Sequence, residues 1–120
     1  MLPLSVVVMD ARGSPRALAA EDGTSLRRSD IAIGKAHGAL AMGLGSRTLF
    51  KRAEAQPSFI AAVTHAVGGM LIPVPGGVLI RDGAGALVGA VGVSGDTSDN
   101  DEAAALAGIE AAGLKADPGA

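Results

Sequence analysis

The two histidines are the first candidates for binding chemistry in this sequence. His65 lies in the stretch from Ala55 to Ile80, which contains no Asp, Glu, Lys or Arg. A histidine in apolar surroundings is suited to be the axial ligand of a haem iron. His37 is the second candidate, and the alternative for both is a partly buried structural residue. The chain has no cysteine, and its histidines follow no recognised metal-ligand spacing, so we expect no metal site made of side chains alone.

Lys35 is the main candidate for catalysis, because it is the only charged residue in the body of an otherwise apolar helical pattern. Burial of a lysine lowers its pKa, which suits it to act as a base or to bind a carboxylate. Asp22 or Asp101 would then move the proton. The alternative is a structural salt bridge between Lys35 and one of these two acids.

Two glycine-containing loops are candidate edges of a ligand site. They contain Gly76 and Gly77 in one case, and Ser94 and Gly95 in the other. The second loop leads into a helix whose free N–H groups are able to receive an anion. Three acidic residues at that helix start would repel phosphate, so helix capping is the alternative: Asp96, Asp99 and Asp101.

Composition limits the classes of function. The chain has 120 residues, 48% of them hydrophobic, which predicts one folded domain over residues 1–120 and excludes disorder through low hydrophobicity. The formal net charge is −2 and only two residues are aromatic, so the chain has neither the charge nor the stacking surface typical of nucleic-acid binding.

The uncharged stretch from Ala55 to Ile80 is longer than the ~20 residues that cross a bilayer. Prolines and glycine pairs interrupt it and would leave backbone groups unsatisfied in lipid. We therefore expect no membrane span, and burial of this stretch inside the protein or between subunits. The N-terminus lacks the basic region of a signal peptide, so we expect a cytoplasmic protein.

The order of expected elements predicts an α+β fold with an antiparallel sheet. A hairpin is expected from strands at 5–9 and 16–21, and another from strands at 78–81 and 86–93 that flank the Asp82–Gly85 turn. Met70–Val74 is expected to be an earlier part of the third strand. Helices are expected at 29–44, with Ser29 or Asp30 as N-cap, at 47–54, at 57–67, and from Ser98, where a capping box begins, to Gly113.

Two further expectations concern packing and the chain end. The helix at 29–44 carries two apolar stripes on nearly opposite sides, which predicts burial of both faces. The first stripe contains Ile33, His37, Leu40 and Leu44, and the second contains Ile31, Lys35 and Met42. Residues 115–120 are expected to form a frayed tail.

Four segments together resemble the GlcG/HbpS-like family, which also includes the C-terminal domain of PduO-type corrinoid adenosyltransferases. They are Val6–Gly13, Ile31–Ala36, Pro75–Ile80 and Val88–Gly95, the last followed by Asp101-Glu102. The last segment is the most specific. The resemblance implies a profilin-like α+β fold with about five antiparallel strands and helices packed on them. It also implies homo-oligomers, either dimers or higher assemblies such as hexamers or octamers. Family members usually begin with an amphipathic helix before the first strand, and we expect this chain to lack it.

These observations lead to one leading hypothesis and two alternatives. The first is a small oligomeric protein that binds haem or a related tetrapyrrole, using His65, His37, Gly76, Gly77, Ser94 and Gly95. The second is an enzyme or accessory subunit acting on a small oxygenated metabolite of a glycolate or diol catabolic cluster, with Lys35, Asp22 and Asp101. The third is a non-catalytic scaffold or partner protein without a small-molecule ligand.

Overall fold

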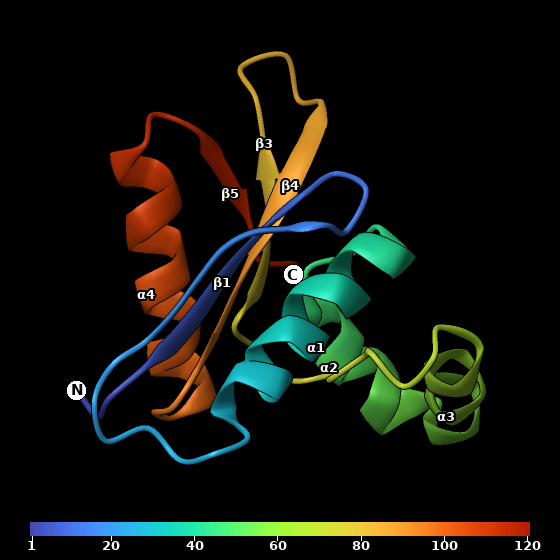
Figure 1. The fold of residues 1–120 in the computed structure, drawn as a ribbon. Coiled ribbons are helices and arrows are strands. Elements are labelled where there is room, and N and C mark those ends of the chain that lie inside the picture. The colour runs from blue at the N-terminus through green and yellow to red at the C-terminus, as the bar shows by residue number, and fades with distance from the viewer.

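One five-stranded antiparallel sheet organises the chain, in the strand order β2-β1-β4-β3-β5 (Figure 1). The computed structural model describes residues 1–120. Its elements are β1 (Ser5–Asp10), β2 (Pro15–Ala20), α1 (Arg28–Met42), α2 (Ser46–Ala55), α3 (Pro57–Ala66), β3 (Gly77–Arg81), β4 (Leu87–Ser94), α4 (Ser98–Ala111) and β5 (Lys115–Asp117). The predicted α+β class and antiparallel sheet are confirmed. None of the four helices combines the length and hydropathy needed to cross a bilayer.

Both hairpins use an aspartate to close the turn. The Asp10 carboxylate accepts hydrogen bonds from the backbone N–H groups of Arg12 and Ser14, at 2.9 and 3.1 Å, between β1 and β2. The Asp82 carboxylate does the same with Ala84 and Ala86, at 2.9 and 3.0 Å, between β3 and β4. Such short-range bonds explain why both hairpins were predictable from local sequence.

Helices cover the two faces of the sheet separately (Figure 1). On one face α1 packs against β1, β3 and β4, and on the other α4 packs against β3, β4 and β5. The sheet-facing side of α1 presents the fully buried Ala32, Ala36 and Ala39, whereas its glycines Gly34 and Gly38 face Ile72 and Leu71 of the segment that crosses the helix. Of the two stripes expected to be buried, Lys35 is 2% exposed, while the large side chains Ile31, Ile33, Leu40 and Met42 flank the contact and are half-buried in the single chain. Burial of the second face by another subunit stays a prediction.

The backbones of α1 and β4 lie so close together that only small residues fit between them. A Cβ atom at Gly92 of β4 would lie 2.0 Å from the carbonyl oxygen of Ala32. No side chain fits at that distance, so α1 lies directly on the sheet only where the strand has glycine.

Helix starts differ from the sequence expectation. α1 begins at Arg28, and its N-cap Arg27 makes no side-chain cap. The Ser29 hydroxyl instead lies 2.7 Å from the Ser5 hydroxyl, so this side chain joins α1 to β1. The cap of α4 is Thr97 rather than Ser98, and its hydroxyl accepts the Asn100 N–H at 3.2 Å.

Residues 70–74 are not part of a strand. Pro73 and Pro75 have no N–H group and cannot join a hydrogen-bonded ladder, so β3 begins only at Gly77. The segment crosses α1 instead, where the Ile72 N–H donates to the Gly34 carbonyl at 3.1 Å.

The prediction of a frayed C-terminal tail was also wrong. Residues 115–117 form the edge strand β5, which pairs with β3. Arg81 of β3 donates to the Asp117 carboxylate at 3.0 Å, and the Ala120 N–H donates to the Thr48 hydroxyl at 3.0 Å. Partners distant in sequence therefore order the tail.

The contrast between two glycines gives a stability test. A Cβ at Gly108 in α4 would meet no atom within 4 Å. We expect Gly108→Ala to raise the free energy of unfolding by about 1 kcal/mol, because alanine is the better helix former. Gly92→Ala should lower it by about 2 kcal/mol through overpacking. Urea denaturation measures both, and a destabilised Gly108→Ala variant would contradict the packing described.

Candidate functional site

Lys35 and Asp101 form a buried ion pair at the end of the sheet. Lys35 lies on α1 and Asp101 on α4, and the two residues are 2% and 1% exposed. The Lys35 ammonium donates to the Asp101 carboxylate at 3.1 Å and to the Val93 carbonyl at 2.9 Å. The second carboxylate oxygen of Asp101 accepts the Asp96 N–H at 2.9 Å. The pair therefore links both helical layers to β4.

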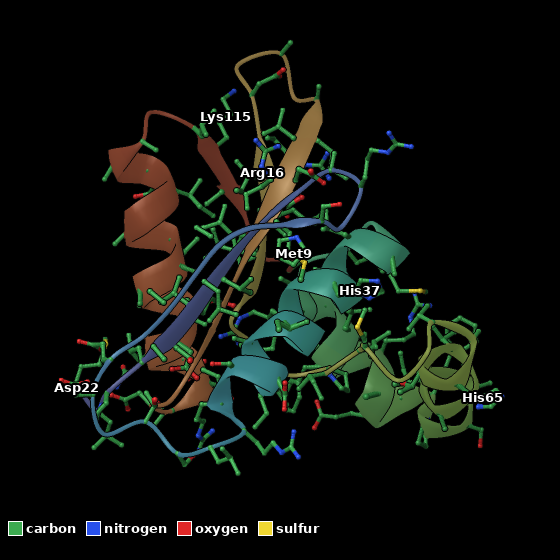
Figure 2. All side chains as sticks on the ribbon, viewed as in Figure 1. Met9, Arg16, Asp22, His37, His65 and Lys115 are labelled. Carbon is green, nitrogen blue, oxygen red and sulfur yellow. The ribbon has the colours of Figure 1, made fainter.

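Burial lowers the pKa of Lys35, while the Asp101 carboxylate opposes the shift and nearby Arg28 adds to it. Neither Lys35 nor Asp101 lines any of the five surface hollows of the molecule. Asp22 lies in the exposed loop after β2 and is not a partner of Lys35 (Figure 2). Of the three candidate catalytic residues, the fold brings two together, in a closed contact.

The predicted cofactor-binding glycines and serine lie around this ion pair and are packed by the chain itself. A Cβ at Gly76 would lie 2.9 Å from the Lys35 ammonium nitrogen. The Gly77 N–H donates to the Ser46 hydroxyl at 2.7 Å, and the Ser94 hydroxyl accepts from Arg28 at 3.3 Å. Gly95 has a φ of 143° and contacts the N-terminal segment, where a Cβ would lie 2.2 Å from the Pro3 carbonyl oxygen.

His37 has the geometry of an oriented ligand. Its Nδ1 lies 2.8 Å from the Met70 carbonyl oxygen, so Nδ1 carries the proton and donates it. Nε2 is then the nitrogen with a free lone pair. The half-buried ring lies beneath the β1–β2 turn, where its Cδ2 is 3.5 Å from the Cβ position of Gly13. His65, by contrast, is exposed on α3 and points outward (Figure 2).

A surface hollow of about 340 Å³ lies close to His37, although His37 is not among its seven lining residues. Met70, whose carbonyl orients the ring, lines it together with Ile33, one turn before His37 on the same helix. Gly68 and Gly69 form its outer edge, both with positive φ of 74° and 84°. The glycine pair directly precedes Met70, whose carbonyl orients His37, and neither glycine was predicted from the sequence as a site residue.

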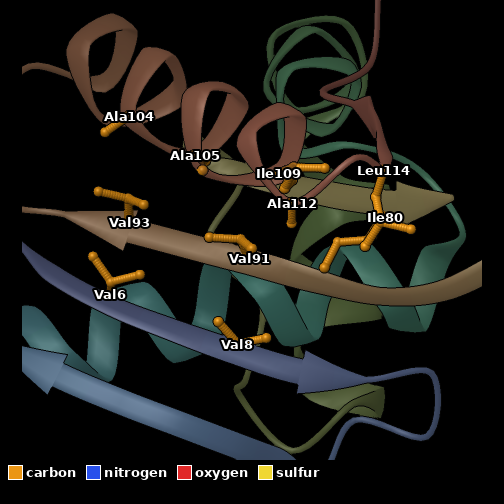
Figure 3. A pocket seen from close by; sticks show the side chains of 11 residues that line it. Val6, Val8, Ile80, Val91, Val93, Ala104, Ala105, Ile109, Ala112 and Leu114 are labelled. Carbon is orange, nitrogen blue, oxygen red and sulfur yellow. The ribbon is translucent and has the colours of Figure 1, made fainter.

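A second hollow, of about 290 Å³, lies on the opposite face of the sheet (Figure 3). Val6 and Val8 of β1 form its floor with Val91 and Val93 of β4, and α4 forms one wall. Its lining side chains are all apolar, so it offers no iron ligand. The sequence feature that indicates this hollow is that both faces of β1 are apolar. Val7 and Met9 face α1, and Val6 and Val8 face the opposite side of the sheet.

Comparisons with known proteins agree on one family. A family profile described as "Haem degrading protein HbpS-like" matches residues 1–110. A crystal structure of a PduOC:heme complex is similar at 25% sequence identity and a TM-score of 0.84, covering 95% of this chain and 81% of that chain. A double mutant of HbpS from Streptomyces reticuli has 28% identity and a TM-score of 0.75, covering 92% and 71%. Among curated proteins, no match was found.

A third structure, the ORFY protein of Klebsiella pneumoniae, supports the fold alone. It has 23% identity and a TM-score of 0.79, covering 91% of this chain and 74% of that chain.

Removal of one member of the ion pair should strongly destabilise the folded protein. We expect Lys35→Met to lower the free energy of unfolding by about 3–5 kcal/mol, because Asp101 would remain buried without a counter-ion. The double variant Lys35→Met/Asp101→Leu should be more stable than the single one. Urea denaturation measures both, and a Lys35→Met variant within about 1 kcal/mol of the wild type would contradict a stabilising pair.

Asp96 should make stability depend on pH. Hydrogen bonds from the backbone N–H groups of Leu2 and Thr97 and from the Asn100 amide lower its pKa below the ordinary 3.8. Since the folded-state pKa is the lower one, Asp96 stabilises the fold above pH 3.8, and this contribution is lost as pH falls through the lowered value. Melting temperatures from pH 7 to 3 should fall less in Asp96→Asn than in the wild type. The exposed Asp22→Asn is the control, and identical profiles for all three proteins would refute the role of Asp96.

Proposed function

Because the chain belongs to the HbpS-like family of haem-degrading proteins, we propose that it binds haem and that His37 is the axial ligand. Similarity to the PduOC:heme complex over 95% of this chain supports the choice of ligand class. The observation that carries the choice of residue is the 2.8 Å contact between His37 Nδ1 and the Met70 carbonyl.

His37 fits the requirements of an iron ligand. Histidines that bind metals almost always donate their other ring N–H to a carbonyl or carboxylate, which fixes the tautomer and the ring orientation. The Met70 carbonyl does this here and leaves Nε2 as the nitrogen for iron. The exposed His65 makes no side-chain hydrogen bond that would orient its ring.

The surroundings of His37 suit an apolar ring system. Ile33, Met70 and Ile72 line the nearby hollow of about 340 Å³ together with Asp30 and three glycines. Contact of a porphyrin with the three apolar side chains would remove their surface from water. Bound haem supplies a redox-active iron, and the chain supplies the ligand nitrogen, its orientation and an apolar contact surface. The proposed working form is a homo-oligomer.

The alternative of an enzyme that uses Lys35, Asp22 and Asp101 is less well supported. Lys35 and Asp101 bind each other at 3.1 Å away from any surface hollow, and Asp22 lies in an exposed loop. A substrate would have to separate a buried ion pair before it reached either group.

Haem titration tests the proposal with a matched pair of variants. We expect haemin to give a shifted Soret band that saturates near one haem per chain in the wild type and in His65→Ala. His37→Ala should lose the shift or bind at least about tenfold more weakly, and added imidazole should restore the band by replacing the missing ligand. Thermal melting of both variants controls for folding.

Three outcomes would contradict this proposal. Absence of any shifted band would exclude haem binding and favour the scaffold alternative. Loss of the band in His65→Ala alone would make His65 the ligand. Equal binding by both variants and the wild type would mean that neither histidine ligates iron.

A further inference from the structure

Helix α3 exposes an apolar face. Only Ile60 of its ten residues is buried. Ile60, Val63 and the following Val67 pack inward on the cluster that contains Leu49 and Leu71. On the outer side, Phe59, Ala62 and Ala66 are exposed, and their spacing of three and four residues places them on one face of the helix. Figure 1 shows α3 at the far end of the α1 layer, away from the sheet.

This outer face also lacks charge, unlike the other helices. No Asp, Glu, Lys or Arg occurs between Glu54 and Arg81. The other three helices expose charged residues to water, among them Asp30, Lys51 and Asp99. Absence of charge together with an exposed aromatic ring is typical of the core of a protein–protein interface.

The Phe59 ring is already positioned for contact. It is 43% exposed, and the Arg52 guanidinium of α2 lies 5.7 Å from its ring centroid. A cation–π contact at this distance restrains the ring before binding, which lowers the entropy lost in an interface.

We propose that this outer face is where two copies of the chain meet, with the two α3 helices antiparallel around a two-fold axis. The order of side-chain sizes along the α3 face favours a second copy as the partner, because the large Phe59 lies at one end of the face and the small Ala66 at the other. Antiparallel pairing places Phe59 of each copy against Ala66 of the other, with Ala62 near the axis. Parallel pairing would set phenylalanine against phenylalanine and leave a gap at Ala66.

The absence of charge supports a second copy as the partner. In a two-fold contact each side chain near the axis meets its own equivalent, so any charged residue there would face a like charge. Phe59, Ala62 and Ala66 carry no charge, so they avoid this repulsion at the axis, and the Arg52 guanidinium lies over Phe59 at the end of the stripe. The inference specifies the oligomer contact of the proposed function and is independent of haem ligation.

The oligomeric state of the haem-free full chain tests the interface. We expect sedimentation equilibrium to show a dimer or a higher assembly built from it. Ala62→Glu should raise the dissociation constant of this contact about 100-fold or more, because it places two carboxylates at the axis. Ala107→Glu, at an exposed position of α4, is the matched control and should leave assembly unchanged. Both variants should melt near the wild-type temperature.

Cysteine cross-linking tests the antiparallel arrangement, because the chain has no cysteine of its own. Under mild oxidation Ala62→Cys should form covalent dimers quickly. Ala66→Cys should not, because the Phe59–Ala66 pairing puts the axis between residues 62 and 63, and at 1.5 Å rise per residue the two equivalents of Ala66 then lie about 10 Å apart along the antiparallel helices. Rapid cross-linking of both variants would indicate parallel helices and refute the arrangement.

Two results would overturn the interface itself. One is a wild-type chain that stays monomeric at all concentrations, which would leave α3 free for a different protein. The other is an oligomer that Ala62→Glu does not weaken. Haem titration of Ala62→Glu separates the two proposals, since a monomer that still shows the shifted Soret band retains the haem site without the interface.

Discussion

The buried ion pair between Lys35 and Asp101 holds the two helical layers in place on opposite faces of the sheet. It joins α1 to α4, and its hydrogen bond to the Val93 carbonyl attaches both helices to β4. Two charges removed from water stabilise a fold only when their hydrogen bonds are complete. No buried side-chain nitrogen or oxygen of the molecule lacks a partner. The pair therefore specifies one arrangement of α1, β4 and α4.

Small residues make that arrangement sterically possible. A side chain at Gly76 would collide with the Lys35 ammonium, one at Gly77 with the Lys35 carbonyl, and one at Gly92 with the Ala32 carbonyl. Alanines on the sheet-facing side of α1 keep the helix backbone close enough for Lys35 to reach Asp101. The many glycines and alanines therefore allow the backbones of α1 and the sheet to pack directly against each other, without large side chains between them.

Because of this close packing, the residues proposed here to bind a ligand lie at the surface. The loops of the HbpS-like chain that carry Gly76, Gly77, Ser94 and Gly95 are filled by its own atoms. On the outer side of α1, the Met70 carbonyl orients His37 near a hollow lined by Ile33, Met70, Ile72 and Asp30. The adjacent α3 exposes Phe59 and no charge. The proposed haem site and the proposed self-association surface therefore both lie in the half of the molecule that the ion pair does not occupy.

The sequence alone determined the features that depend on neighbours within a few residues. Both hairpins follow from Asp10 and Asp82, which bond backbone groups two and four residues ahead, and helix periodicity located the four helices to within a few residues. The motif around Val88–Gly95 also indicated the family, which the profile match confirms. For Lys35 the sequence offered a salt bridge with Asp22 or Asp101 only as the alternative to a catalytic role, and the structure contains this salt bridge, with Asp101 as the acid.

Three features were decided only by the tertiary structure. They are the acid that pairs with Lys35, the histidine whose ring is oriented by a hydrogen bond, and the pairing that orders the C-terminal residues. Asp101 lies 66 residues from Lys35, and the Met70 carbonyl lies 33 residues from His37. Residues 115–117 form the strand β5 because they pair with β3, whose other edge pairs with β4. Such contacts depend on how whole elements stack, and local residue preferences do not encode them, because their energy is gained only after distant segments have met.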